Sequence, residues 1–334
     1  ALSSAASDVY KRQVKRREKL HSRQRWIGKL SRYAAIFIVP VLAVVFYYSQ
    51  RENVEITEQP QSKSGVFTIQ RNLPVLTLSN GKEMVLYNQE LLLEEENGVR
   101  ISVNEEGRMQ YDRADSVGTE MVYNTLTTPS QCDFTFTLAD GTKVWMNAKS
   151  SLRYPVAFQG RERVVYAEGE IYLEVARDEK HPFFVMLNGM KVEVLGTSFN
   201  VSVYNDENIV ETALMEGKVK LTMQGCPSKP VYLTPSQKFI YSRSDRQGTI
   251  SIMEGDTELA WKQGILAFSA EPLEEVFRKI ERWYGVTMHY DKESLVDDNF
   301  TGQFKMISIQ EMMNILRMHY NLKFKIENND IYIC

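Results

Sequence analysis

The sequence is poor in the residues that metal sites and disulfide frameworks need. It has 3 cysteines and 4 histidines in 334 residues. The cysteines, Cys132, Cys226 and Cys334, are too few and too scattered for a disulfide framework, although one bridge between Cys132 and Cys226 stays open in an oxidising compartment. The histidines show no metal-ligand spacing among themselves or with the cysteines. We therefore expect no metal site.

The motifs of common enzyme classes are missing as well. The sequence has no Walker phosphate loop, no G-x-G-x-x-G and no G-x-S-x-G. The Lys149-Ser150-Ser151 triplet is the remaining candidate, but it follows a predicted hairpin and precedes a strand, which is typical of a polar loop rather than a Ser-Lys dyad. We expect no catalytic residue, no cofactor and no enzyme activity.

Charge and hydropathy are distributed unevenly. The net charge of -3 is too small to indicate a nucleic-acid partner, but basic residues crowd the flank 14–32. An uncharged apolar run follows, which predicts one transmembrane helix over 33–49, although Pro40 removes one helical hydrogen bond. No small-residue cleavage site follows it, so we expect an uncleaved anchor. The positive-inside rule then places the flank in the cytoplasm and the rest outside it, which in a bacterium with two membranes is the periplasm.

Two segments near this helix have no predicted fold. The opening "ALSSAASDVYKRQ", residues 1–13, resembles translated adapter sequence, so we expect native sequence to begin near Val14 and part of the cytoplasmic region to be missing. Residues 50–64 are polar, contain Pro60 and show no periodicity, which is typical of a linker.

Short alternating runs separated by turn dipeptides fill residues 65–256. Such dipeptides supply the positive φ angles that tight hairpins need, so this region is predicted to be an all-β domain of repeated hairpins, a sandwich or a roll. The dipeptides are Asn80-Gly81, Asn97-Gly98, Glu106-Gly107, Asp140-Gly141, Gln159-Gly160, Glu168-Gly169, Asn188-Gly189 and Glu216-Gly217.

Two of these runs resemble each other. "LTLSNGKEMVL", residues 76–86, aligns with "FTLADGTKVWM", residues 136–146. A repeated β unit weakens any claim that the second copy is a unique active site. In that copy Trp145 points away from Val144 and Met146, so it either covers a second sheet or marks a contact surface.

The last part, 262–334, alternates between helical and strand patterns. Apolar residues recur at helical spacing in 273–284 and again in 309–320, where Ser308 and Glu311 form a capping box. With the flanking apolar runs, the order β-α-β-β-α-β-β predicts a small open α/β sandwich with two helices on one face of the sheet.

Several ordered motifs carry a family resemblance. "LADGTKVWMNAKSSLRYP", "GEIYLEVARD", "HPFFV", "VEVLGTSFNV" and "ALMEGKVKL" resemble the periplasmic region of FecR-type anti-sigma factors of gut Bacteroidetes, and the resemblance covers nearly the whole chain from the basic flank onward. The tail is similar to the secretin and TonB short N-terminal fold. The motif positions given a structural role are Asp140, Gly141, Trp145, Asn147, Gly169, Gly196 and Gly217.

The resemblance implies a single-pass inner-membrane anti-sigma factor. Such a protein holds an extracytoplasmic-function sigma factor in the cytoplasm and senses the signalling domain of a TonB-dependent outer-membrane receptor, with membrane-embedded or periplasmic proteases as further partners. A sigma-binding domain of several helices is expected before the basic flank, and this chain departs from that pattern. The candidate receptor-binding residues are Trp283, Tyr284, Phe300 and Phe304. The alternative is a membrane-anchored periplasmic scaffold or glycan-binding module.

Overall fold

The computed structural model describes most of the chain from Leu73 onward. All of its described residues belong to one compact unit, Ile69–Cys334. Within them, no helix is both long and apolar enough to cross a membrane. The predicted membrane helix 33–49, its basic flank and the linker 50–64 lie outside this part. The described ranges are 73–86, 91–94, 100–103, 109–112, 121–224, 229–253, 255 and 257–333.

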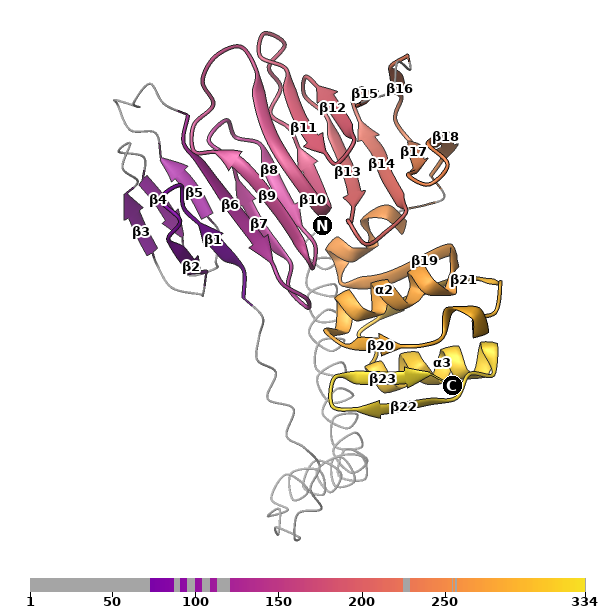
Figure 1. Ribbon diagram of the computed structural model, residues 1–334. Coiled ribbons are helices and arrows are strands. Elements are labelled where there is room, and N and C mark those ends of the chain that lie inside the picture. The colour runs from indigo at the N-terminus through magenta and orange to yellow at the C-terminus, as the bar shows by residue number, and fades with distance from the viewer. Residues whose placement is uncertain are drawn as a thin grey trace, which may run out of the picture. The chain divides into compact units, whose positions relative to one another are not determined.

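Two large sheets that share one strand make up the β region, which is mainly β as predicted (Figure 1). Sheet A runs in the order β2 (Glu83–Val85), β1 (Val75–Thr77), β6 (Tyr123–Thr128), β9 (Ser150–Pro155), β10 (Arg163–Glu174), β11 (Phe183–Leu187), β12 (Met190–Val194), β15 (Val219–Met223), β16 (Val231–Leu233). Sheet B runs β3 (Leu91–Glu94), β4 (Arg100–Val103), β5 (Met109–Asp112), β7 (Phe134–Thr137), β8 (Lys143–Met146), β10, β13 (Ser198–Val203), β14 (Ile209–Glu216), β17 (Gln237–Ser242), β18 (Gln247–Ile252).

Strand β10 passes from one sheet to the other at Gly169. Its first half pairs with β9 and β11 in sheet A, and its second half pairs with β8 and β13 in sheet B. Gly169 has φ +86°, and a Cβ there would lie 2.4 Å from the Ser150 hydroxyl oxygen. The prediction of a hairpin turn at Glu168-Gly169 is therefore wrong, because this glycine bends a continuous strand and lets β9 approach it closely.

The hydrophobic core lies between the two sheets. Alternate residues of each strand point inward, as the burial of every second residue in β6 and in most of β10 shows. The largest fully buried side chains of this region include Tyr154, Phe136, Phe183 and Phe199. Phe136 and Tyr154 come from different sheets, and their rings lie 5.2 Å apart. Apolar inward faces of both sheets therefore hold the β region together.

Most of the other described turn dipeptides connect neighbouring strands. Asn80-Gly81 joins β1 to β2, Asp140-Gly141 joins β7 to β8, and Asn188-Gly189 forms the two-residue turn between β11 and β12. Each of these glycines has a positive φ angle. Asn97-Gly98 and Glu106-Gly107 lie outside the described residues.

The tail has the predicted order of elements. After η1 (Thr257–Gln263) come β19 (Ile265–Pro272), α2 (Leu273–Tyr284), β20 (Thr287–His289), η2 (Lys292–Ser294), β21 (Asn299–Lys305), α3 (Ile309–Tyr320), β22 (Phe324–Glu327) and β23 (Asp330–Ile333). Both halves of the predicted capping box of Ser308 and Glu311 are present at the start of α3. Gly285 and Asn321 end the two helices in the left-handed conformation.

The strands of the tail form two sheets rather than the expected one. Strand β19 pairs with β21, and β20 pairs with β23, which also pairs with β22. Each helix therefore connects a strand of the first sheet to a strand of the second, so the prediction of two helices on one face of a single sheet is wrong. The apolar faces of α2 and α3 share one core with residues of both sheets, including Phe268, Phe300 and Ile331.

Candidate functional site

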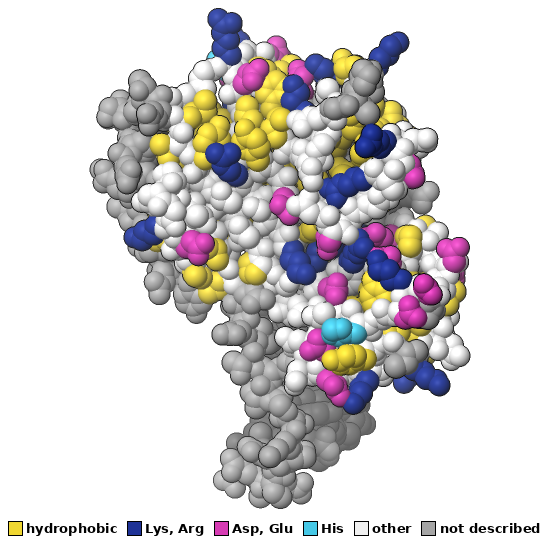
Figure 2. Space-filling model, in the orientation of Figure 1, with side chains coloured by type: hydrophobic (Ala, Val, Ile, Leu, Met, Phe, Trp, Pro, Cys, Tyr) yellow, Lys and Arg dark blue, Asp and Glu magenta, His cyan; other side chains and the backbone are white. Residues whose placement is uncertain are grey.

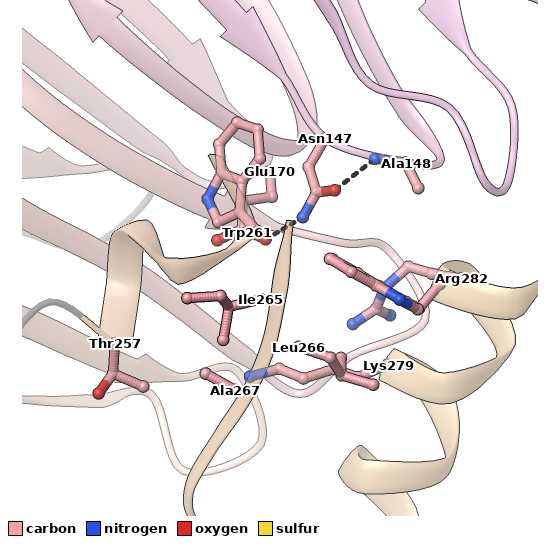
Figure 3. Close-up of a pocket in the computed structure, with 11 residues that line it drawn as sticks. Asn147, Ala148, Glu170, Thr257, Trp261, Ile265, Leu266, Ala267, Lys279 and Arg282 are labelled. Carbon is pink, nitrogen blue, oxygen red and sulfur yellow. Dashed lines mark hydrogen bonds between the residues drawn. The ribbon is translucent and has the colours of Figure 1, made fainter. Parts of the chain in front are cut away.

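The tail meets the β region along the outer face of sheet B. Because side chains alternate across a strand, the polar residues between the buried positions of β10, β13 and β14 point away from the core. Among them, Glu170, Ser202 and Glu211 line a pocket together with residues of β19 and α2. A second, smaller pocket beside it is shown in Figure 3, with Glu170 and Asn147 on one side and Lys279 and Arg282 of α2 on the other. We call this contact region the junction.

Glu170 lies at the centre of the junction. Its carboxylate accepts hydrogen bonds from Asn147 Nδ2 at 2.7 Å and from Asn200 Nδ2 at 3.0 Å. The Asn147 amide oxygen in turn accepts from the backbone N–H of Ala148, and both bonds of Asn147 are drawn in Figure 3. Burial raises the pKa of Glu170, and the nearby Lys279 ammonium and the two amides offset part of that rise.

Arg282 ties helix α2 to the β region. Its side chain is 7% exposed, and Nη2 lies 2.6 Å from Glu207 Oε1. The guanidinium carbon also lies 3.9 Å from the centre of the Tyr204 ring, a cation–π contact. The Tyr204 hydroxyl donates to the backbone oxygen of Ala148 at 2.9 Å, and burial raises the pKa of Tyr204. This ion pair holds α2 against the turn that carries Glu207. Separating the two side chains is costly, because removing one partner of a buried ion pair leaves an uncompensated charge.

A loop after β6 makes the second attachment of α2. The backbone N–H of Gln131 donates to the Arg282 carbonyl oxygen at 3.0 Å, and the Gln131 side-chain amide donates to the carbonyl oxygen of Tyr284. Gly285 follows directly, with φ +64°, and a Cβ there would lie 2.8 Å from the Gln131 side chain. The end of α2 is thus held both by the turn that carries Glu207 and by the Gln131 loop.

Four of the family-motif positions belong to the second hairpin or to its end. Asp140 forms a buried ion pair with Arg163, 2.7 Å between Oδ2 and Nη1, and Gly141 has φ +87° in the turn. Trp145 lies on the outer face of sheet B against Tyr172, 5.3 Å between ring centres, and Lys262 Nζ lies 4.0 Å above its ring. Trp145 is therefore covered by η1 rather than by a second sheet. Asn147 is the amide that binds Glu170.

The remaining motif positions are three glycines at close approaches. Gly169 bends β10, as described above. A Cβ on Gly196 would lie 2.7 Å from Arg177, and one on Gly217, which has φ +94°, would lie 2.8 Å from the Thr197 hydroxyl oxygen. These positions require glycine for steric reasons.

The four candidate receptor-binding residues are in different surroundings. Trp283 lines pockets at the junction. The Tyr284 hydroxyl donates to the Ile307 carbonyl oxygen at 3.1 Å. Phe300 is 4% exposed and belongs to the tail core, and Phe304 packs against that core while partly exposed. The structure thus brings Phe300 and Phe304 together, with stacked rings 6.0 Å apart, and places Trp283 elsewhere.

Sequence reasoning missed the most exposed apolar side chains of the tail and the charged residues of the junction. Met306 is 93% exposed after β21, and Met318 is 77% exposed on α3. Met318 falls between the apolar positions of the helical pattern, and this spacing could have indicated that its side chain is exposed. Glu170 stands inside the quoted motif "GEIYLEVARD" and is charged in an apolar strand, a sign of a buried polar contact. Nothing local to Arg282 indicates its partner Glu207, which is distant in sequence.

Comparisons with known proteins agree with this architecture. The family model of FecR protein matches residues 124–220, and the model of the FecR C-terminal region matches residues 265–333. Two crystal structures of a Parabacteroides distasonis protein assigned as an anti-sigma factor are similar, each with a TM-score of 0.60 and 28% identity. The matches cover 63% of this chain and 98% of the crystallised chain. The curated proteins give no match.

Proposed function

This chain belongs to the FecR-type anti-sigma factors, and we propose that it relays a signal from a TonB-dependent outer-membrane receptor across the inner membrane to an extracytoplasmic-function sigma factor. A sigma-factor partner and a regulatory rather than enzymatic role follow from the family. The receptor, the membrane anchor at 33–49, the periplasmic location of the rest, and proteolytic release near 51–64 or within the membrane belong to the proposal.

The observation that carries the relay is the attachment of α2 at the junction. A receptor domain that docks on the tail can change the β region only if the two are mechanically connected. Arg282 with Glu207, and the Gln131 loop with the end of α2, supply that connection. Arg278 adds a hydrogen bond from its Nη1 to the Asp206 carbonyl oxygen. A shift of α2 would therefore displace the turn between β13 and β14 and the loop after β6.

The tail is the proposed docking site for the receptor. Trp283, Tyr284, Phe300 and Phe304 remain the candidate residues. Phe304 is partly exposed, as Trp283 and Tyr284 are, and Met306, two residues further along the chain, is 93% exposed. Exposed methionine is adaptable and common at protein-binding surfaces. The buried Phe300 would act by supporting the β21 strand rather than by touching a partner.

Binding of a purified receptor signalling domain to the full chain tests the docking site. We expect Met306→Glu together with Phe304→Ala to weaken binding at least tenfold, and deletion of 264–334 to abolish it. Ile252→Glu is the matched control, because Ile252 is also an exposed apolar residue, at 64%, but lies in the β region. Unchanged binding to the deletion variant would reject the tail as the docking site.

A reporter gene for the sigma factor tests the relay separately. Replacing Arg282 by Met and Glu207 by Leu removes the ion pair without leaving a lone buried charge. We expect this double variant to bind the receptor domain normally and to lose most of the receptor-dependent reporter response. A full response in this variant would contradict a relay through Arg282.

The alternative function, a membrane-anchored scaffold or glycan-binding module, has one observation in its favour. On the outer face of sheet A, Tyr123 and Tyr166 have ring centres 6.3 Å apart, and the Arg153 guanidinium lies 4.2 Å from the Tyr123 ring. Tyr166 is 41% exposed. Polysaccharide binding that Tyr166→Ala removes, without any receptor partner, would favour this function over the relay.

A further inference from the structure

Strand β18 is an open edge of sheet B. Among the described strands it pairs only with β17, and Figure 1 shows it at the margin of the β region. All of its residues except Ser251 are exposed, including Ile250 at 48% and Ile252 at 64%. An exposed edge strand offers unpaired backbone groups to any other strand that can reach it. The edge of β18 is therefore a candidate interaction surface.

The backbone groups of alternate residues of β18 point away from β17. The N–H of Met253 donates to the Ser236 carbonyl oxygen at 2.9 Å, so Met253 faces β17. The direction of the hydrogen-bonding groups alternates along a strand, which makes Ile252, Ile250 and Gly248 face outward. None of these three has a backbone hydrogen bond to another element in the described part of the chain. Each leaves one donor and one acceptor free at the edge.

The pairing of β17 gives the same direction independently. The N–H of Arg243, the residue after β17, donates to the Asn208 carbonyl oxygen beside β14 at 2.9 Å. Alternation makes Tyr241 face β14 as well, and Tyr241 stands opposite Gly248. Two opposed residues of an antiparallel pair either bond each other or both point away. Gly248 therefore faces outward, as Met253 also indicates.

A second copy of β18 fits this edge in antiparallel orientation. A two-fold axis between two copies of Ile250 sets Gly248 of one copy opposite Ile252 of the other. All of these residues present outward backbone groups, so each opposed pair can exchange two N–H···O=C bonds. One symmetric contact therefore satisfies the whole free edge of both copies.

The side chains are complementary in this register as well. Gly248 has no side chain, and a Cβ there would overlap the Phe239 ring. Ile252 of the other copy would lie over the glycine and pack beside that ring. On the other face of the strand Thr249 would stand opposite Ser251, a pair that can share a hydroxyl hydrogen bond. Self-complementarity of this kind favours a second copy over a strand of an unrelated protein.

The edge also lacks the charges that keep strands apart. Residues 247–253 contain no Asp, Glu, Lys or Arg. Charged side chains are gathered instead where the tail meets the β region, as Figure 2 shows. Proteins commonly protect an exposed edge strand with a lysine or a proline, and β18 has neither. Nothing in the strand itself therefore opposes pairing with another strand.

We propose that two copies of this chain associate through β18, so that sheet B continues from one copy into the other across a two-fold axis. Only one strand of each copy contributes to this contact, so we expect a weak dimer that depends on concentration. The proposal does not depend on the receptor relay.

Sedimentation equilibrium of the purified full chain in mild detergent tests the proposal. We expect a reversible dimer of the unmodified chain. Ile250→Pro should weaken the dimer at least tenfold, because proline removes an N–H that faces outward and leaves the hydrogen bonds to β17 in place. Ile250→Val keeps this N–H and should dimerise nearly as well as the unmodified chain.

An exchange of charge tests the two-fold register. Ile250→Lys and Ile250→Glu each place like charges opposite each other across the axis, so each variant alone should dimerise at least tenfold more weakly. A mixture of the two sets Lys opposite Glu and should form mixed dimers at least tenfold more tightly than either variant alone. Val296→Lys is the matched control, because Val296 is also 48% exposed but lies in the tail. It should dimerise like the unmodified chain.

Three results would overturn the proposal. A chain that stays monomeric up to about 0.1 mM does not pair through β18, and its edge is then open to a strand of another protein. A dimer that Ile250→Pro and both charge variants leave unchanged uses a different surface. Charge variants that fail to associate when mixed contradict the two-fold register. Thermal unfolding shows whether each variant folds, and the charge variants supply the test if Ile250→Pro does not.

Discussion

The hairpins 76–86 and 136–146 have the same turn in different surroundings. In the first, the N–H of Gly81 donates to the Leu78 carbonyl oxygen and Asn80 Oδ1 accepts from the N–H of Lys82. In the second, the N–H of Gly141 donates to Leu138 in the same way, and Asp140 Oδ1 accepts from the N–H of Thr142. Both are three-residue loops closed by a glycine of positive φ, +81° and +87°.

The difference between the copies lies in what surrounds the turn. Asn80 and Lys82 are exposed, whereas Asp140 pairs with buried Arg163 and Thr142 is fully buried. The second hairpin also leads directly into Asn147 and the junction. A repeated sequence therefore specifies a repeated turn, while contacts distant in sequence make only the second copy part of the candidate site.

Asp140→Ala should show the largest difference between the hairpins. It leaves the Arg163 guanidinium, in a side chain that is 5% exposed, without its carboxylate, which should lower the free energy of unfolding by about 3–5 kcal/mol. Asn80→Ala, the matched change in the first hairpin, removes one exposed hydrogen bond and should cost about 0.5–1 kcal/mol. Urea unfolding of both variants measures this.

A double variant checks the cause. Asp140→Leu with Arg163→Met should be more stable than Asp140→Ala, because no buried charge is left alone. Equal losses in Asp140→Ala and Asn80→Ala would show that the turn alone, and not its surroundings, determines stability at both sites.

Local patterns in the sequence predicted much of this fold. The period of apolar residues predicted α2 and α3, Ser308 with Glu311 predicted the cap of α3, and the turn dipeptides predicted several strand connections. Glu168-Gly169 misled because a glycine of positive φ can bend a strand as well as turn a hairpin. The sequence around such a glycine does not indicate whether the neighbouring strands allow a bend or a hairpin turn.

The candidate site was less predictable than the fold. Asn147 was singled out from a motif, but its partner Glu170 and the pair of Arg282 with Glu207 depend on how the tail packs on sheet B. The two-sheet arrangement of the tail has the same origin, since strand pairing is set by tertiary contacts. Sequence periodicity describes one element at a time and cannot report such pairings.

Asn147→Ala should cause the second largest loss of stability. The free energy of unfolding should fall by about 2–3 kcal/mol, because the buried Glu170 carboxylate loses one of its amide donors. The pKa of Glu170 is already above its unfolded value, so its contribution to stability is greatest at low pH and is lost as the pH rises through the folded pKa. Losing the donor raises that pKa further, so the deficit of Asn147→Ala should grow with increasing pH.

Chemical denaturation across a pH series measures this dependence. Glu170→Gln in the Asn147→Ala background should remove the added pH dependence. A deficit that is the same at every pH would show that Asn147 acts through packing alone and that the second hairpin is not coupled to the charge of the junction.

Thr142→Val tests a smaller contact of the second hairpin. The Thr142 hydroxyl donates to Asp140 Oδ2 at 2.8 Å and accepts from the N–H of Ala176 at 3.1 Å. Valine keeps the shape and removes both bonds, which should cost about 1–2 kcal/mol in urea unfolding. Lys82→Thr in the first hairpin, where the position is exposed, should change stability by less than about 0.5 kcal/mol. A comparable loss at both positions would contradict the difference in surroundings.

Gly81→Ala and Gly141→Ala should show the smallest difference between the copies. Both glycines have nearly the same positive φ, a Cβ on Gly81 would meet nothing within 4 Å, and one on Gly141 would meet only Ala176 Cβ at 4.0 Å. Backbone strain should therefore dominate in both variants, at about 1–2 kcal/mol each. Urea unfolding should give losses that agree within about 0.5 kcal/mol. A clearly larger loss for Gly141→Ala would mean that the buried contacts of the second hairpin extend to the geometry of its turn.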